Sequence, residues 1–220
     1  MKTYLDKNVY EAALERIAYC FQEFDNVLVA FSGGKDSGVM LNLCYNYADE
    51  HGLLDKLTMY HLDYEAQYQM TTEYVTRTFL EQFPGIRKMW YCVPIKAQSA
   101  CALGEPYWTP WDAAKKKLWV RAMPENPHVV HEGNLDVPFR HGMVDYEFQD
   151  KLSRHFAKKR GTTAVMVGLR ADESLNRYAA VARGKKRRSY EGRKWITQTS
   201  AVTANVYPLY DWRVSDIWTA

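Results

Sequence analysis

The stretch of sequence that decides the fold is Asn26-Val-Leu-Val-Ala-Phe-Ser-Gly-Gly-Lys-Asp-Ser37. Its apolar first half, residues 26–31, predicts a buried β-strand, because apolar and β-branched residues follow one another without interruption. Its polar second half, residues 32–37, leads into an apolar periodicity that predicts a helix over residues 37–50, closed by Gly52. A strand, a glycine loop and a helix therefore follow one another without a gap.

The loop formed by residues 32–37 has the composition of a phosphate-binding loop. Gly33 and Gly34 permit tight backbone turns, so that N–H groups can point at an anion. The start of the following helix adds unpaired donors and the positive end of its dipole. Ser32 and Ser37 add hydroxyl groups and Lys35 adds a charge. The loop lacks the G-x-x-x-x-G-K-[ST] order of a Walker A loop, so we predict a phosphate site of another kind.

Strand and helix patterns alternate around this loop. They predict helices at residues 8–24 (with Asn8 as the N-cap), 66–82, 148–160 and 171–180, strands at 57–62, 88–93 and 163–167, and a last strand or turn near Val206. This order predicts an α/β fold, a doubly wound and mostly parallel sheet of about five strands with helices on both faces. We expect one domain over residues 1–220, with an irregular insertion at about residues 94–147 and a basic loop at 183–194.

Composition bounds the class of protein. The 220 residues are 47% hydrophobic and 25% charged, as in globular rather than disordered chains. No apolar run approaches the roughly 18 residues needed to cross a bilayer, and the first residues lack the apolar core of a signal peptide. The four cysteines form no CxxC pair and are interpreted as reduced thiols. We therefore expect a cytoplasmic protein without a membrane partner.

Two further blocks of sequence follow predicted strands. Gly168-Leu-Arg-Ala-Asp-Glu-Ser174 contains Arg170, whose planar fork suits phosphate or sulfate, and Glu173, which orients that arginine or caps the helix. The later block is Tyr207-Pro-Leu-Tyr-Asp-Trp-Arg-Val-Ser-Asp-Ile-Trp218. In it we expect Asp211 to act structurally, as a turn or helix cap, and the tryptophans to pack in the core.

The order S-G-G-K-D-S at residues 32–37 resembles the pyrophosphate-binding loop (PP-loop) of the ATP pyrophosphatase, or adenine nucleotide alpha hydrolase-like, superfamily. Together with the two later blocks it resembles the PAPS (phosphoadenosine phosphosulfate) reductase-like family, over nearly the whole chain. Residues 62–68, 105–112 and 172–177 resemble the IbrA-like group of bacteria and phages. Members of that group are described as PAPS reductases or sulfotransferases and often accompany a ParB-like partner protein.

The resemblance implies an adenine nucleotide as the ligand, either ATP or a PAPS-like molecule. It implies catalytic roles for Lys35 and Arg170. The nucleotide-binding residues that we predict are Ser32, Gly33, Gly34, Lys35, Asp36, Ser37, Leu62, Asp63, Gly168, Arg170 and Glu173. Mg²⁺ would arrive with ATP, near Asp36. We expect no iron–sulfur cluster and no protein-held metal, because the cysteines and the six histidines show no ligand spacing.

One departure from the family bears on the reaction. Thiol-dependent PAPS reductases carry a C-terminal E-C-G-[IL]-H segment, which this sequence lacks. Cys20, Cys44 and Cys92 are interpreted as core residues, and Cys101 lies in the insertion. We therefore expect an enzyme that cleaves ATP between its α- and β-phosphates, or one with sulfonucleotide chemistry. Thiol-dependent PAPS reduction, and a non-catalytic nucleotide sensor acting with a ParB-like partner or DNA, stay open as alternatives.

Positive charge is concentrated late in the chain. Residues 1–110 hold 9 Lys and Arg against 14 Asp and Glu, whereas residues 111–220 hold 20 against 12. Residues 183–194 alone carry seven positive charges and one glutamate. Three interpretations of this stretch stay open: a flap over nucleotide phosphates, a nucleic-acid contact and a protein docking site. An oligomer is also compatible with the sequence.

An aromatic cluster in the insertion has two interpretations. Trp108, Trp111 and Trp119 lie close to Asp112 in a segment without periodicity. The first interpretation is a small satellite core, and the second is a recognition platform beside the nucleotide.

Overall fold

The computed structural model describes residues 6–99, 104–182 and 189–220. Its centre is an eight-stranded sheet in which the first six strands pair in parallel and the last two are added by antiparallel pairing. The strands in spatial order are β6 (Val129–His131), β3 (Arg87–Cys92), β2 (Leu57–Leu62), β1 (Asn26–Ala30), β7 (Thr163–Val167), β10 (Thr203–Val206), β9 (Arg193–Gln198) and β8 (Ser189–Tyr190).

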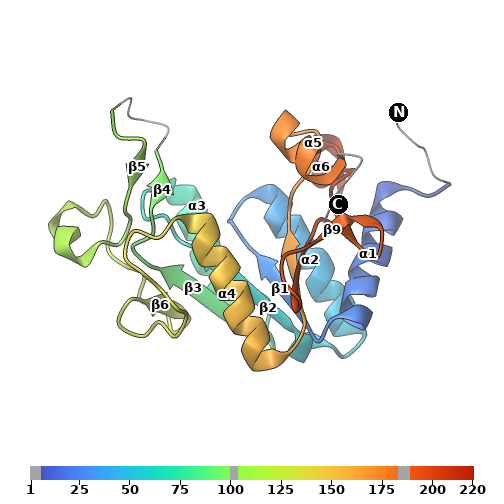
Figure 1. Ribbon diagram of the computed structural model, residues 1–220, viewed down its shortest axis with the longest axis horizontal. Helices are drawn as coiled ribbons and strands as arrows, with labels where there is room; N and C mark the ends of the chain where they lie inside the picture. The colour runs from blue at the N-terminus through green and yellow to red at the C-terminus, as the bar shows by residue number, and fades with distance from the viewer. Residues whose placement is uncertain (1–5, 100–103, 183–188) are drawn as a thin grey trace.

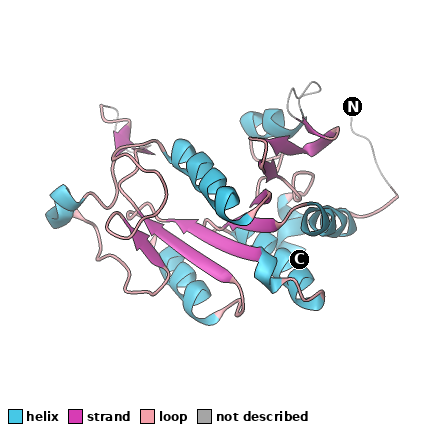
Figure 2. Cartoon of the chain, turned by 60° about the horizontal axis from the view of Figure 1, so that its bottom comes forward, coloured by secondary structure: helices cyan, strands magenta, loops and turns pink. Residues whose placement is uncertain are grey.

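Helices cover both faces of this sheet, as the alternating pattern predicts (Figures 1 and 2). The α-helices are α1 (Val9–Glu23), α2 (Lys35–Glu50), α3 (Gln69–Glu81), α4 (Asp145–Arg160), α5 (Leu175–Ala182) and α6 (Val214–Thr219). Side chains of α1, α2 and α3 join one apolar cluster with the sheet, and those of α4 join a second cluster on the other face. The α/β fold with a mostly parallel sheet is therefore confirmed.

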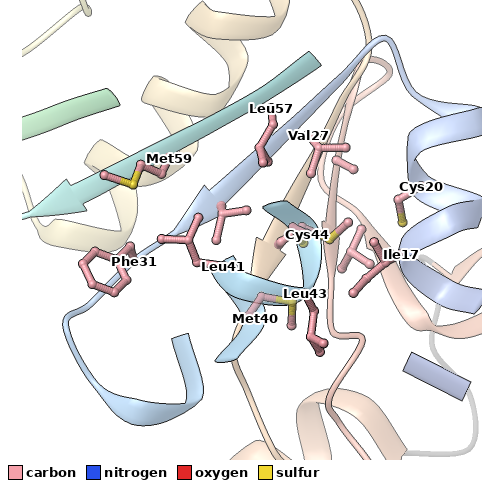
Figure 3. Packing of buried hydrophobic residues seen from close by; sticks show 14 of the residues in the cluster. Ile17, Cys20, Val27, Phe31, Met40, Leu41, Leu43, Cys44, Leu57 and Met59 are labelled. Carbon is pink, nitrogen blue, oxygen red and sulfur yellow. The ribbon is translucent and has the colours of Figure 1, made fainter. Parts of the chain in front are cut away.

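The larger apolar cluster shows why the strand–loop–helix unit is rigid. Ile17 of α1 and Leu41 and Cys44 of α2 pack in one apolar cluster with Val27 of β1 and Leu57 of β2 (Figure 3). All five side chains are completely buried. Full burial of such a side chain stabilises a fold by roughly 1.5–3 kcal/mol, so this packing fixes α2 against β1 and β2.

The sheet has eight strands rather than the five predicted. The extra strand β6 is three residues long and lies in the insertion, where no periodicity reveals it. The extra strand β8 and the first two residues of β9 lie in the basic stretch, whose charge favours a loop interpretation. Glu191 and Gly192 join them with φ of 47° and 75°, the positive values that a two-residue hairpin turn requires. Short edge strands gain their stability from pairing, which sequence periodicity does not report.

Two helices begin later than predicted, because the residues before them form loops. Helix α3 begins at Gln69 rather than residue 66, after a turn in which Glu65 has φ of 63°. Helix α5 begins at Leu175 rather than residue 171. The predicted N-cap at Asn8 is confirmed, since its side chain accepts a hydrogen bond of 2.8 Å from the Glu11 backbone N–H.

The insertion contains short elements and lies at the side of the sheet away from both chain ends (Figure 1). These elements are the 3-10 helix η2 (Ala113–Leu118) and the paired strands β4 (Ala97–Gln98) and β5 (Tyr107–Trp108). A further 3-10 helix, η1 (Leu54–Lys56), precedes β2. That residues 1–220 form one domain stays a prediction.

The last sequence block anchors the end of the described chain to α1. Asp211 accepts hydrogen bonds of 2.8 and 2.7 Å from the two terminal nitrogens of the buried Arg16. The role of Asp211 is therefore structural, as expected, although it forms a partly buried ion pair rather than a helix cap. Trp212 is 1% exposed and donates to the Val9 carbonyl, whereas Trp218 is 73% exposed, so the prediction of a packed tryptophan is wrong for Trp218.

Candidate functional site

The loop between β1 and α2 is shaped by its glycines. Gly33 has φ of 81°, and a Cβ atom there would lie 2.7 Å from a methyl group of Val75 in α3. Gly34 is the N-cap of α2 and supplies no side-chain cap. The first backbone N–H groups of α2 therefore stay open to an outside acceptor such as a phosphate oxygen.

The two serines of the loop hold its shape. The hydroxyl of Ser37 donates to the Gly34 carbonyl over 3.0 Å and accepts from the Ser32 backbone N–H over 3.1 Å. The two hydroxyl oxygens lie 2.9 Å apart. Since Ser37 is only 5% exposed and its hydroxyl is fully engaged, it fixes the loop, while Ser32 faces the cavity described next.

A cavity of about 500 Å³ opens at the carboxyl ends of β1, β2 and β7, a size typical of small-molecule sites. The structure thus brings the glycine loop, the end of β2 and the end of β7 to one place, as a doubly wound sheet predicts. The predicted residues that line it are Ser32, Gly34, Asp36, Ser37, Leu62, Gly168 and Glu173. The predicted residues outside its lining are Gly33, Lys35, Asp63 and Arg170.

Gly168 lets the β7 loop approach the start of α2. A Cβ atom at Gly168 would lie 2.9 Å from the backbone nitrogen of Ser37 and 3.0 Å from the carbonyl group of Asp36. Those atoms belong to backbone that cannot move aside. The glycine therefore permits the contact that closes the floor of the cavity.

Arg170 lies behind the cavity and is held by carboxylates. Its side chain is 5% exposed, and its Nε donates to Asp36 over 2.9 Å. It also pairs with Asp172 and lies 3.8 Å from Glu173. Arg170 thus joins the start of α2 to the β7 loop, which makes it a positioning residue for Asp36 in this structure.

Arg177 is the cavity cation that sequence reasoning missed. It lines the cavity from α5 and pairs with Glu173, four residues earlier. The E-x-x-x-R spacing is a helix-pairing signal that was available in the sequence. Lys35, 35% exposed and 3.3 Å from Asp36, is a second cation at the loop. Among the described residues near the loop, the three cations Lys35, Arg170 and Arg177 are matched by the three carboxylates of Asp36, Asp172 and Glu173.

The wall of the cavity away from the loop is largely aromatic and neutral. Tyr60 donates to Gln149 over 2.8 Å, and Tyr64 donates to Asp145 over 3.0 Å, so both rings are fixed against α4. Burial raises the pKa of both phenols, which keeps them uncharged at neutral pH. Tyr60, Tyr64 and Leu62 offer a surface suited to a flat ring.

Asp63 is buried next to the cavity and is engaged by protein groups. Its carboxylate accepts from Arg121 at 2.6 and 2.7 Å, from Trp90 at 2.8 Å and from the Glu65 backbone at 2.7 Å. Arg121 belongs to the insertion. Asp63 therefore ties the insertion to the end of β2, a contact that no sequence motif reveals.

The tryptophans near η2 complete this attachment. Trp111 is 2% exposed, its indole N–H donates to the Asp63 carbonyl, and its backbone N–H donates to the Glu65 carboxylate. Trp119 packs edge-on against it, with ring centroids 5.1 Å apart. These tryptophans therefore pack as core residues, but Trp111 belongs to the main apolar cluster, with Trp119 packed against it, rather than to a separate satellite core as predicted.

Thiol and metal chemistry have limited support among the described residues. Cys20, Cys44 and Cys92 are buried, and burial raises the pKa of each thiol. Cys101 lies outside the described residues, as do residues 183–188 of the basic stretch. Within the described ranges, no group of three or more His, Cys, Asp or Glu side chains could hold a metal ion. None of the helices described there is both long and apolar enough for a membrane span.

The fold and loop define a PP-loop α/β protein, and comparison with known families places it more closely. The model of the phosphoadenosine phosphosulfate reductase domain matches residues 26–220. The chain belongs to this family.

The individual proteins that resemble this chain are either longer than it or low in sequence identity to it. The uncharacterized protein YbdN of Escherichia coli K12 is 34% identical over 218 residues, which are 98% of this chain and 52% of that protein. The chain thus spans about half the length of this relative. The phosphoadenylyl-sulfate reductase of Candida auris matches 99% of this chain and 86% of its own, at 13% identity and a TM-score of 0.47. The NH3-dependent NAD synthetase of Campylobacter jejuni matches 97% of this chain and 72% of its own, at 11% identity and a TM-score of 0.42.

Proposed function

We propose that the chain binds an adenine nucleotide in the cavity at the carboxyl edge of the sheet and cleaves it between the α- and β-phosphates. The observation that carries the proposal is the open start of α2, where Gly34 leaves backbone N–H donors facing a cavity of ligand size. Membership of the PAPS reductase domain family supports the same ligand class. The phosphates would lie on residues 32–37 and the base against Leu62 and the neighbouring tyrosines.

ATP with Mg²⁺ fits the charges better than a free nucleotide anion. The described cations and carboxylates around the loop balance, so this part of the chain offers little net charge to the four negative charges of ATP. Asp36 and Glu173 line the cavity, and carboxylate oxygens are the protein ligands that Mg²⁺ accepts beside phosphate oxygens. The ion would supply charge neutralisation, and the backbone donors and Lys35 would stabilise charge on the leaving pyrophosphate.

Two alternatives to ATP cleavage stay open. In the first, the ligand of the same cavity is PAPS, although the described cysteines are buried, which counts against their thiols acting in a reduction. A sensor acting with a ParB-like partner or DNA would bind nucleotide without turning it over. Membership of the IbrA-like group, which residues 62–68, 105–112 and 172–177 resemble, is likewise a proposal.

Calorimetric titration tests the binding step with Mg-ATP, its α,β-methylene analogue and PAPS. Lys35→Ala removes one charge-assisted hydrogen bond from a partly exposed site, so we expect affinity to fall about tenfold, or ~1.4 kcal/mol. Lys158→Ala is the matched control, since that lysine is exposed on α4 and does not line the cavity. Absence of binding for all three ligands, or equal affinity in both variants, would refute the proposal. Binding without any turnover would favour the sensor.

A further inference from the structure

A second cavity of about 500 Å³ lies between α4 and the edge of the sheet, and the proposed function does not use it. It begins at Arg87, the first residue of β3, and at Lys159 and Arg160, the last residues of α4. Arg87 stands at the amino end of its strand, whereas the nucleotide cavity lies at the carboxyl ends of β1, β2 and β7. The described linings of the two cavities share no residue.

The floor of this second cavity is apolar. Met89 and Tyr91 are two residues apart on β3 and therefore lie on the same face of the strand. Leu152 and Phe156 lie one helical turn apart on α4. Tyr91, Leu152 and Phe156 are buried. An apolar part of a ligand would gain stability by leaving water for this floor.

The rim of the same cavity is positively charged. It holds Arg87, Lys159 and Arg160 against one carboxylate, that of Asp136, which leaves an excess of two positive charges. Lys159 pairs with Asp136 at 2.6 Å, and this hydrogen bond is the main reason that the pKa of the aspartate is lowered. Within the described residues, Arg87 and Arg160 are exposed and form no salt bridge. The guanidinium of Arg160 lies over the Phe156 ring, 5.5 Å from its centroid, and its N–H donors at the edge of that contact can still bind an anion.

A histidine inside the rim lacks a hydrogen-bond partner. The Nε2 atom of His155 is buried without one, and it lies 3.6 Å from the Asp136 carboxylate, beyond hydrogen-bond distance. Buried ring nitrogens normally find a partner. His155 lines the cavity, so an oxyanion there would provide one.

We propose that this cavity binds an amphipathic organic anion, with its apolar body against Met89, Tyr91 and Phe156 and its carboxylate or phosphate head at Arg87 and Arg160. The volume suits a small molecule. A nucleic-acid backbone would need cations along an open surface without an apolar floor, so the concave apolar interior favours the small molecule.

Calorimetric titration of the whole chain with decyl phosphate and with decanoate tests the site, and the two arms separate the head groups. Inorganic phosphate and decanol are the controls, since each supplies half of the ligand. We expect saturable binding of at least one amphipathic anion, with the two half-ligands at least tenfold weaker. Binding should persist in saturating Mg-ATP, because the cavities are separate. Displacement by Mg-ATP, or equally tight binding of decanol, would overturn the proposal.

Two further measurements locate the site. Arg87→Gln should weaken decyl phosphate or decanoate binding about tenfold, whereas Lys158→Gln, which changes an exposed neighbour outside the lining, should leave it unchanged. In the wild-type chain labelled with ¹³C-methyl methionine, the Met89 methyl signal should shift on binding and the Met40 signal should not. Equal affinities in the two variants, or an unshifted Met89 signal at saturation, would contradict the assignment.

Discussion

Replacing Arg121 by methionine tests whether the insertion is tied to the sheet through Asp63. The change removes hydrogen bonds of 2.6 and 2.7 Å to the Asp63 carboxylate and one of 2.9 Å to the Glu65 carbonyl. Asp63 is completely buried, so its charge would lose its only cationic partner in the described chain. Breaking one side of a buried ion pair costs about 3–5 kcal/mol. Trp90 still donates to Asp63, so we expect the lower end, about 3 kcal/mol.

Equilibrium unfolding in urea, followed by tryptophan fluorescence, measures this loss directly. Domains of this kind have roughly 5–15 kcal/mol of stability, so the variant should stay folded with a clearly lower midpoint. Arg140→Met is the matched control, because Arg140 is 72% exposed and lies 3.8 Å from Glu147. Its cost should stay below about 1 kcal/mol. If Arg121→Met costs no more than the control, the attachment inferred for the insertion is wrong.

Three further predictions follow from single contacts. Gly168→Ala should weaken Mg-ATP binding and lower stability by about 1–3 kcal/mol, because its Cβ meets α2 backbone, whereas Gly104→Ala, with open space, should do neither; equal effects would contradict this. Hydrogen bonds from the Thr162 hydroxyl and backbone lower the pKa of Asp25, so this carboxylate stabilises the fold above its ordinary pKa of about 4 and loses that effect as pH falls through the lowered value. The stability difference between wild type and Asp25→Ala should therefore shrink as the pH is lowered below about 4, and a difference that stays constant throughout the acid range would be evidence against it. The described cysteines, buried and with raised thiol pKa, should react with a thiol reagent at about pH 8 only after unfolding, so more than one fast thiol per chain would disagree.

The elements that the sequence predicts well are those with a complete local signal. The strands at residues 57–62 and 163–167 match at both ends, because each is a short, mostly apolar stretch bounded by loop residues. The sequence does not reveal β6, β8 and β9. The three residues of β6 show no periodicity and pair with β3 some forty residues earlier, whereas β8 and the start of β9 lie in a charged stretch that lacks the apolar pattern of a strand.

The site divides in the same way. The shape of the Ser32–Ser37 loop follows from local glycine chemistry and could be predicted. The contacts of Arg170 and Asp63 could not, because Arg170 meets Asp36 134 residues away and Asp63 meets Arg121 58 residues away. Both residues were predicted as nucleotide ligands, and both roles stay predictions, since the structure places them behind or beside the cavity lining.

The central claim is that the cavity beside residues 32–37 binds ATP and directs cleavage between the α- and β-phosphates. Phosphorus NMR of the chain incubated with Mg-ATP tests this most directly, because it distinguishes the products of the two possible cleavages. The account predicts pyrophosphate together with AMP or an adenylated product, formed by the wild type and lost in Lys35→Ala. Release of ADP and inorganic phosphate, or pyrophosphate formation that is equal in Lys35→Ala, would contradict it.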